Sequence, residues 1–361
     1  MRSPSHVAST CLLFSALAIA SATGQNAAPG QLPIPLDLPH PGLATNAPYP
    51  PQPILQGGVV VPLYAPDSPY LKPEHVREAE RYSMSQAAPG HIDNIVNIHN
   101  PSIEVHTVGG FNTGAAVILV AGGGHKTLNV GPEGADFVPF FANYGVTTII
   151  LRNRLRSDGY NVQTDAVRDA EQAMRLVRAH AAEWRIDPHK IGIMGFSAGA
   201  EIATYVAVFY DEFNKNNNAP SDPLAGISAR PDFVGVVYPG PTPFANGHKP
   251  TIARDEPPSF IVCAGADDQV HAVWADEYFA AMLAVRVPNL EMHIYANGAH
   301  PGDPRPDGSH MSGGLSDRNG TPLGTWQFRF IDWFRDLGFL GTSGTRTKAQ
   351  ADIVAAENRP K

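Results

Sequence analysis

The chain has 361 residues, a formal net charge of −8 and only 17% charged residues, with 34 glycines and 34 prolines. Its length can bury the core of one large α/β domain or of two smaller ones. The acidic balance, without long charge runs, argues against a nucleic acid partner, because phosphate binding needs a basic patch. With only Cys11 and Cys263, a disulfide framework is excluded, and we expect Cys263 to be a small buried hydrophobe.

Residues 1–22 have the pattern of a secretory signal peptide. Arg2 supplies positive charge, residues 11–20 form an apolar run, and Ala20-Ser21-Ala22 offers a cleavage site. The run is shorter than the ~20 residues that a membrane-spanning helix needs. We therefore expect a secreted or periplasmic protein without stable membrane insertion.

Residues 23–89 form a proline-rich segment, with 13 prolines between Pro29 and Pro73. These residues show no regular hydrophobic periodicity, which predicts an extended, partly disordered lead segment. This segment is expected to be either a linker or a strap lying on the domain. An α/β pattern predicts a catalytic domain over residues 90–341, and the polar residues 342–361 are expected to form a frayed tail.

Seven short apolar runs within the α/β region predict a mainly parallel central sheet flanked by helices on both faces. They cover residues 103–106, 116–120, 146–151, 191–194, 233–238, 259–263 and 290–295. Periodic or apolar stretches predict helices over 163–183, 200–208, 273–285 and 324–337. Long surface loops are expected over 211–232 and 301–322.

The pentapeptide Gly195-Phe196-Ser197-Ala198-Gly199 fits the G-x-S-x-G pattern between a predicted strand and a predicted helix. A serine on such a sharp turn has its hydroxyl exposed, and small neighbours give the turn room. The N–H of Ala198 then lies at a helix start, where it can stabilise negative charge. We predict that Ser197 is a nucleophile; the alternative is an ordinary turn with a serine N-cap.

A serine nucleophile needs a base and a carboxylate that orients this base, and both follow along the chain in the order typical of α/β-hydrolases. After the run at 259–263, Asp268 stands directly before the turn into the next helix and is the predicted acid. Asp267 is the alternative, and either could instead cap that helix. His300 ends the loop after the last predicted strand and is the predicted base. Four other histidines lack such a loop position: His189, His271, His293 and His310.

Three consecutive glycines, Gly122 to Gly124, follow the run at 116–120 and allow backbone N–H groups to point inward. We predict that Gly123 and Gly124, with Ala198, hold the oxyanion of an ester reaction. A flexible turn is the alternative, and a phosphate loop is disfavoured because no G-K-[ST] follows. We expect no metal site and no cofactor, since the chain has no H-E-x-x-H, cysteine pair or dinucleotide fingerprint.

Taken together over residues 100–340, these motifs resemble the α/β-hydrolase superfamily, and more closely the secreted acetyl xylan esterases and the bacterial feruloyl and acetyl esterases. The resemblance rests on residues 120–125, 151–155, 165–188, 193–199, 228–233, 255–258 and 298–300. It implies a triad of Ser197, Asp268 and His300, with Gly123 and Gly124 in the oxyanion hole. Relatives usually continue with Gly-His-Leu after the serine turn, where this chain has Ala200-Glu201-Ile202.

We therefore expect a secreted serine carboxylesterase that removes short acyl groups from polysaccharides or oligosaccharides through an acyl-enzyme. Acetyl is the acyl group that we expect. A small serine peptidase of the prolyl oligopeptidase type is one alternative, although the chain lacks the repeats of a propeller. A catalytically silent hydrolase fold that binds carbohydrate or a protein partner is another. The presence of all three triad residue types in order disfavours it.

Overall fold

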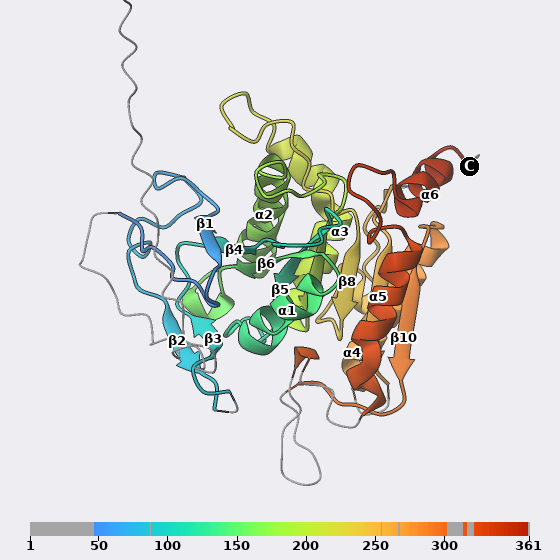
Figure 1. Ribbon diagram of the computed structural model, residues 1–361, viewed down its shortest axis with the longest axis horizontal. Helices are drawn as coiled ribbons and strands as arrows, with labels where there is room; N and C mark the ends of the chain where they lie inside the picture. The colour runs from blue at the N-terminus through green and yellow to red at the C-terminus, as the bar shows by residue number, and fades with distance from the viewer. Residues whose placement is uncertain are drawn as a thin grey trace, which may run out of the picture. The chain divides into compact units, whose positions relative to one another are not determined.

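The computed structural model describes residues 47–86, 88–253, 255–265, 268–301, 313–315 and 321–359 (Figure 1). The predicted signal peptide, the alternative acid Asp267 and His310 lie outside these residues, as does most of the predicted loop at 301–322.

The central sheet has eight strands in the order β1-β4-β6-β5-β7-β8-β9-β10. Strands β1 and β4 pair antiparallel, as do β4 and β6, and every other neighbouring pair is parallel. The strands span Val59–Pro62 (β1), Ser102–His106 (β4), Ala116–Val120 (β5), Thr147–Arg152 (β6), Ile191–Phe196 (β7), Val234–Val237 (β8), Ser259–Ala264 (β9) and Glu291–Tyr295 (β10). These pairings confirm the prediction of a mainly parallel sheet. The prediction succeeded because continuous apolar runs are typical of strands buried on both faces.

Two helical layers cover the sheet. Helices α2 (Val167–Ala179) and α3 (Ala198–Asn216) pack against each other and against β7. Helices α1 (Phe137–Ala142) and α5 (Trp326–Asp336) meet through ring contacts, with the Phe137 and Trp326 centroids 5.9 Å apart. Helix α4 (Gln269–Ala284) packs on β9.

Smaller elements complete the fold. A separate hairpin consists of β2 (Arg81–Met84) and β3 (Ile92–Val96). Short 3-10 helices span Arg156–Asp158, Ala245–Gly247 and Pro322–Thr325, and single π-helical turns span Gly131–Ala135 and Val162–Ala166. Within the described residues, no helix is both long enough and apolar enough to cross a bilayer.

One of the predicted loop boundaries is corrected. The loop expected over 211–232 begins later, because α3 continues to Asn216 and buries Phe213.

Cys263 lies in β9 and is completely buried, so the expectation for this residue is confirmed.

The described part of the proline-rich segment, residues 47–86, is not a linker. It lies as a strap on the domain, which was the other predicted role, and β1 within it forms an edge of the sheet beside β4. Tyr49, Ile54, Leu63 and Leu71 of the strap are buried. Pro62 ends β1, and an edge strand tolerates a proline there because one side of the strand needs no partner.

The fully buried carboxylate of Glu104 on β4 holds the strap to the sheet. It accepts the backbone N–H groups of Ile54 at 2.6 Å and of Leu55 at 2.9 Å. It also accepts Arg152 Nη2 at 2.9 Å and lies 2.8 Å from His106 Nε2. Because each of its oxygens is hydrogen-bonded, the cost of burying its charge is offset.

The C-terminal residues also depart from prediction. Residues 348–357 form helix α6 (Lys348–Glu357) rather than a frayed tail. A capping box opens this helix, in which the Thr347 and Gln350 side chains each accept the other's backbone N–H. Ala349 is buried, and Lys190 Nζ donates to the preceding carbonyls of Gly341 and Thr342, both at 3.0 Å.

We predict that Glu104→Ala lowers the free energy of unfolding by about 3 kcal/mol, because it leaves the Arg152 guanidinium buried without its carboxylate. Urea denaturation measures the change, and limited proteolysis should show cleavage of the strap first. The control is Glu183→Ala, whose exposed pairing with His180 should contribute less than about 1 kcal/mol. Equal losses in the two variants would contradict this role of Glu104.

Candidate active site

Ser197 stands on the turn between β7 and α3, with φ 51° and ψ −117°. This backbone conformation is unfavourable for a residue with a side chain, so the surroundings must hold it. A Cβ at Gly195 would collide with the carbonyl group of Gly199, and a Cβ at Gly199 would collide with the carbonyl oxygen of Val120. The two glycines therefore permit the close packing of this turn. The Ser197 side chain makes no capping hydrogen bond, so the alternative role as N-cap is not observed.

The structure brings the three predicted triad side chains together. Ser197 Oγ lies 2.9 Å from His300 Nε2, and His300 Nδ1 lies 3.2 Å from Asp268 Oδ2. They follow β7, β9 and β10, whose carboxyl ends lie at the same edge of the sheet. Asp268 is buried and makes no capping bond to α4, although it stands directly before that helix. This is the geometry that a serine nucleophile and its base require.

Asp268 carries the negative charge that such a chain of hydrogen bonds needs. Burial alone would raise the pKa of its carboxyl group, but hydrogen bonds from His271 and His300 outweigh burial and lower the pKa to about 2. The group is therefore ionised at neutral pH and can stabilise a protonated His300 imidazole.

The glycine turn lies beside the serine. A Cβ at Gly122 would come within 3.0 Å of Ser197 Cβ. Gly123 and Gly124 have φ values of 127° and 63°, which favour glycine. The N–H of Gly122 already donates to Glu133 Oε2 at 2.7 Å, which leaves the next two glycines as the candidate oxyanion donors.

Sequence reasoning missed His271. Its ring is parallel to that of His300, with centroids 3.7 Å apart and an interplanar angle of 4°. Its Nδ1 makes a short hydrogen bond with Asp268 Oδ1, so one carboxylate serves both imidazoles. The D-x-x-H spacing could have indicated this, because positions i and i+3 share one side of a helical turn.

Glu201, the residue that departs from the relatives, is buried rather than directed into solvent. Its Oε2 lies 2.8 Å from Nε2 of His125, which follows the glycine turn and is also buried. The pair joins the glycine turn to the first turn of α3. No local pattern marks it, since the partners are 76 positions apart.

Glu133 supports the glycine turn directly and the predicted base, His300, through Tyr238. Besides the Gly122 N–H, its carboxylate accepts the Tyr238 hydroxyl at 3.1 Å, and this hydroxyl accepts the Gly314 N–H at 3.0 Å. The Tyr238 ring meets the His300 ring edge-on, with centroids 5.3 Å apart. Burial raises the pKa of Glu133 to about 7, although both hydrogen bonds oppose this change.

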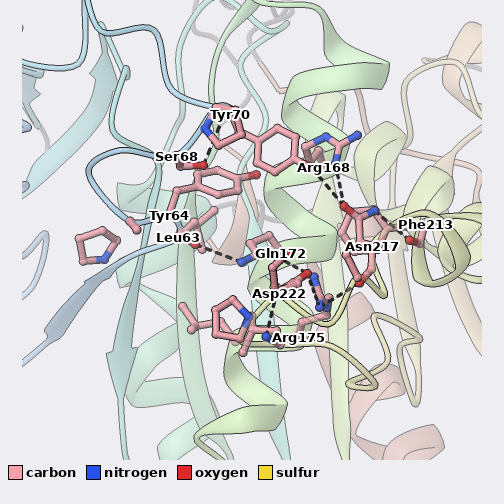
Figure 2. A pocket seen from close by; sticks show the side chains of 18 of the residues that line it. Leu63, Tyr64, Ser68, Tyr70, Arg168, Gln172, Arg175, Phe213, Asn217 and Asp222 are labelled. Carbon is pink, nitrogen blue, oxygen red and sulfur yellow. Dashed lines mark hydrogen bonds and ion pairs between the residues drawn. The ribbon is translucent and has the colours of Figure 1, made fainter.

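The described pockets lie away from this site. Figure 2 shows one of about 760 Å³, lined by Tyr64, Tyr70, Arg168, Arg175, Phe213 and Asn217 among others. The pocket flanks the C-terminal end of α3, whereas Ser197 stands directly before the first residue of α3. The length of this helix, about 27 Å, therefore separates the pocket from Ser197. Arg168 covers the Tyr70 ring at 4.5 Å, and Arg175 pairs with Asp222 at 2.9 Å. We do not assign this pocket to the active site.

Comparisons with known proteins agree with the fold. A family model described as BD-FAE matches residues 110–238, which include the glycine turn and Ser197. A solved bifunctional acetyl ester-xyloside hydrolase from Caldicellulosiruptor lactoaceticus superposes with a TM-score of 0.58 and 23% identity, covering 79% of this chain and 98% of that one. The chain has the α/β-hydrolase fold and resembles acetyl xylan esterases. The predicted fold class is confirmed.

Other similar proteins carry related descriptions. Thermogutta terrifontis esterase 2, solved after phosphoramylation by tabun, has a TM-score of 0.54 and 19% identity, with 80% of this chain and 98% of that one covered. An acetylxylan esterase of Xylanibacter ruminicola is 29% identical over 127 residues, which are 35% of this chain and 23% of that protein. Endo-1,4-beta-xylanase B of Butyrivibrio fibrisolvens is 27% identical over 168 residues, 46% of this chain and 24% of that protein. The matches thus span about a quarter of these two curated relatives.

Glu133→Gln tests the role of the buried carboxyl group. In the wild type, the folded state raises the pKa of Glu133 from 4.5 to about 7, so its contribution to stability is complete below pH 4.5 and is lost as pH rises toward 7. The glutamine does not titrate. We therefore expect the stability of the variant, relative to wild type, to rise by about 3 kcal/mol between pH 4.5 and pH 8. Urea denaturation at both pH values measures it; a difference that is independent of pH would contradict the prediction.

Proposed function

We propose that this protein is a serine esterase that hydrolyses short-chain acyl esters, acetyl esters in particular, on polysaccharides or oligosaccharides. The observation that carries the proposal is the continuous hydrogen-bonded chain from Ser197 through His300 to Asp268. The resemblance to an acetylxylan esterase supports acetylated xylan as the substrate class. The signal-like residues 1–22 support a secreted or periplasmic location, where such polymers are accessible.

In the proposed mechanism, Ser197 Oγ attacks the ester carbonyl carbon while His300 Nε2 accepts the hydroxyl proton. Asp268 orients the imidazole and stabilises its positive charge. The carbonyl oxygen becomes an oxyanion, held by the backbone N–H groups of Gly123, Gly124 and Ala198, and each donor is worth roughly 3 kcal/mol.

Collapse of the tetrahedral intermediate breaks the bond to the alcohol. His300 gives its proton to the departing sugar oxygen, and the acyl group stays on Ser197. A water molecule then attacks the acyl-enzyme while His300 accepts one of its protons. The second collapse releases the carboxylic acid, returns the proton to Ser197 Oγ and restores the free enzyme.

The decisive substitution is Ser197→Ala. We expect it to lower kcat on an acetyl aryl ester by about 10⁴-fold or more, because no nucleophile remains. Release of acetate from acetylated xylan should fall with it. The control is Ser343→Ala, which changes an exposed serine near the C-terminus.

Three outcomes would overturn this proposal. Near wild-type ester hydrolysis by the Ser197→Ala variant would remove the nucleophile assignment. Faster turnover of a proline-containing peptide than of every acetyl ester would favour the peptidase alternative. A wild-type protein that a covalent serine probe fails to label would favour the silent binding fold.

His271→Ala tests the second imidazole. We expect kcat to fall about tenfold with a smaller change in KM, since the charged Asp268 loses one hydrogen-bond donor and His300 loses its stacked neighbour. His271→Phe keeps an aromatic ring but no donor, so it should recover only part of the loss. Exposed His189→Ala is the control. Unchanged kcat in both His271 variants would show that His300 and Asp268 need no such support.

A further inference from the structure

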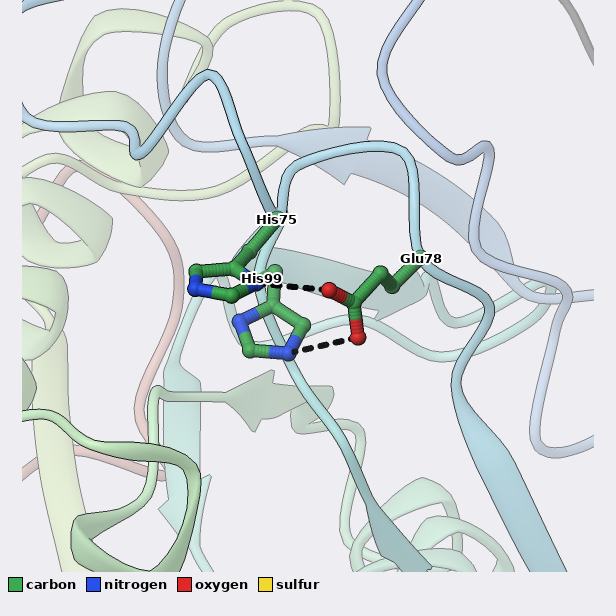
Figure 3. A group of neighbouring side chains, drawn as sticks. All are labelled: His75, Glu78 and His99. Atoms are coloured by element: carbon green, nitrogen blue, oxygen red, sulfur yellow. Dashed lines mark hydrogen bonds and ion pairs between the residues drawn. The ribbon is translucent and has the colours of Figure 1, made fainter.

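Three side chains of metal-binding type converge outside the candidate active site, where the strap meets the residues before β4. His75 and Glu78 belong to the strap, and His99 precedes β4 (Figure 3). His75 Nδ1 lies 2.6 Å from Glu78 Oε1, and His99 Nε2 lies 3.7 Å from Glu78 Oε2. One donor atom from each residue lies within 4.8 Å of the other two. Figure 3 shows both imidazoles on the same side of the carboxylate.

The surroundings orient the buried member of this group. The side chain of His99 is only 4% exposed, and its Nδ1 lies 2.8 Å from the hydroxyl of buried Tyr160. A hydrogen bond at Nδ1 leaves Nε2 directed to Glu78, which is how proteins commonly orient a metal-binding histidine. Asn97 Oδ1 lies 3.2 Å from the same Nε2, and the Asn97 amide is fixed because its Nδ2 donates to Ala79 O at 2.9 Å.

We propose that His75, Glu78 and His99 bind one divalent transition-metal ion, with zinc as the best match to their chemistry. Two imidazole nitrogens and a carboxylate oxygen are a typical zinc donor set, and Asn97 Oδ1 or a water molecule can complete four-coordination. Donors bound tetrahedrally at 2.0–2.1 Å stand roughly 3.3 Å from one another.

The observed separations need little change to reach that geometry. The 3.7 Å between His99 and Glu78 and the 3.2 Å between His99 and Asn97 lie close to the tetrahedral value. The hydrogen-bonded contact of 2.6 Å between His75 and Glu78 must widen, as the ion replaces the proton that these two groups share. A proton at His75 Nδ1 or at His99 Nε2 moves to the other ring nitrogen or leaves to solvent, and no oxidation or reduction is involved.

A second pair in the same protein shows what the third donor adds. His180 and Glu183 have the same i, i+3 spacing, a 2.8 Å contact and exposures of 41% and 67%, against 44% and 46% for His75 and Glu78. Within the described residues, no third donor joins that pair. His99 therefore distinguishes the proposed site from an ordinary surface contact. A bound ion would tie the strap to the residues that lead into β4.

A lysine beside the cluster does not occupy it. Lys72 Nζ donates to Gly159 O at 2.9 Å and lies 4.2 Å from the Tyr160 ring centroid. The Glu78 carboxylate contacts both histidines. The negative charge of Glu78, which attracts a cation, lies beside the ligand nitrogens of the two histidines.

The experiment uses the full chain carrying His271→Ala, because Asp268, His271 and His300 form the other described group of three donor atoms. After treatment with EDTA and dialysis, the protein is titrated with zinc chloride and its metal content is measured by mass spectrometry. We expect one zinc per chain and a rise of the melting temperature by about 4 °C at zinc concentrations of 100 Kd.

Added in that background, His75→Ala and Glu78→Gln should each weaken zinc binding at least tenfold and abolish the rise in melting temperature. Both side chains are partly exposed, so these variants should fold without zinc. The matched control His180→Ala should bind as tightly as the parent. Zinc should also slow trypsin cleavage after Arg77 in the parent and in the control only.

The proposal is overturned if the parent binds no zinc at micromolar concentrations. It is also overturned if the His75 and Glu78 variants bind zinc as tightly as the parent, or if zinc raises their melting temperature equally. None of these measurements involves ester hydrolysis, so the outcome is independent of the proposed function.

Discussion

The strained turn at Ser197 is the constraint on which the rest of the site depends. Its backbone can stay at a positive φ only because α3 starts in direct contact with the end of β5, where neither Gly195 nor Gly199 leaves space for a Cβ. This contact sets where the hydroxyl projects and brings the glycine turn after β5 alongside it. The strain is held by packing, as is common at functional sites, and the buried sheet supplies that packing.

Around this turn, buried polar groups form a support that couples the parts of the site. Glu133 connects the glycine turn to Tyr238, whose ring contacts His300. Glu201 and His125 connect the other end of the glycine turn to α3. A buried carboxylate is tolerated in such a place only with partners, so each pairing restricts where the candidate oxyanion donors and the base can lie.

The strap depends on the same physics at the β1 edge of the sheet. Its prolines prevent a regular hydrophobic period, yet buried side chains such as Ile54 and Leu63 anchor it, and Glu104 satisfies its backbone N–H groups. The cluster of His75, Glu78 and His99 lies on this strap and on the residues it covers. The proline-rich segment is thus part of the folded unit, attached both by buried apolar side chains and by Glu104.

Strands β4 to β10, most helices and the positions of Ser197 and His300 were determined by local sequence, because apolar periodicity and tight-turn residues act over a few positions. The order of serine, aspartate and histidine followed as well, since parallel strands present their carboxyl ends at one edge. Only the tertiary structure decided that Asp268 contacts His300, that His271 stacks on it, and that Glu201 pairs with His125. A buried polar side chain has the same hydropathy as an exposed one, and its partner is distant in the chain. The pairing can therefore be seen only in the folded structure.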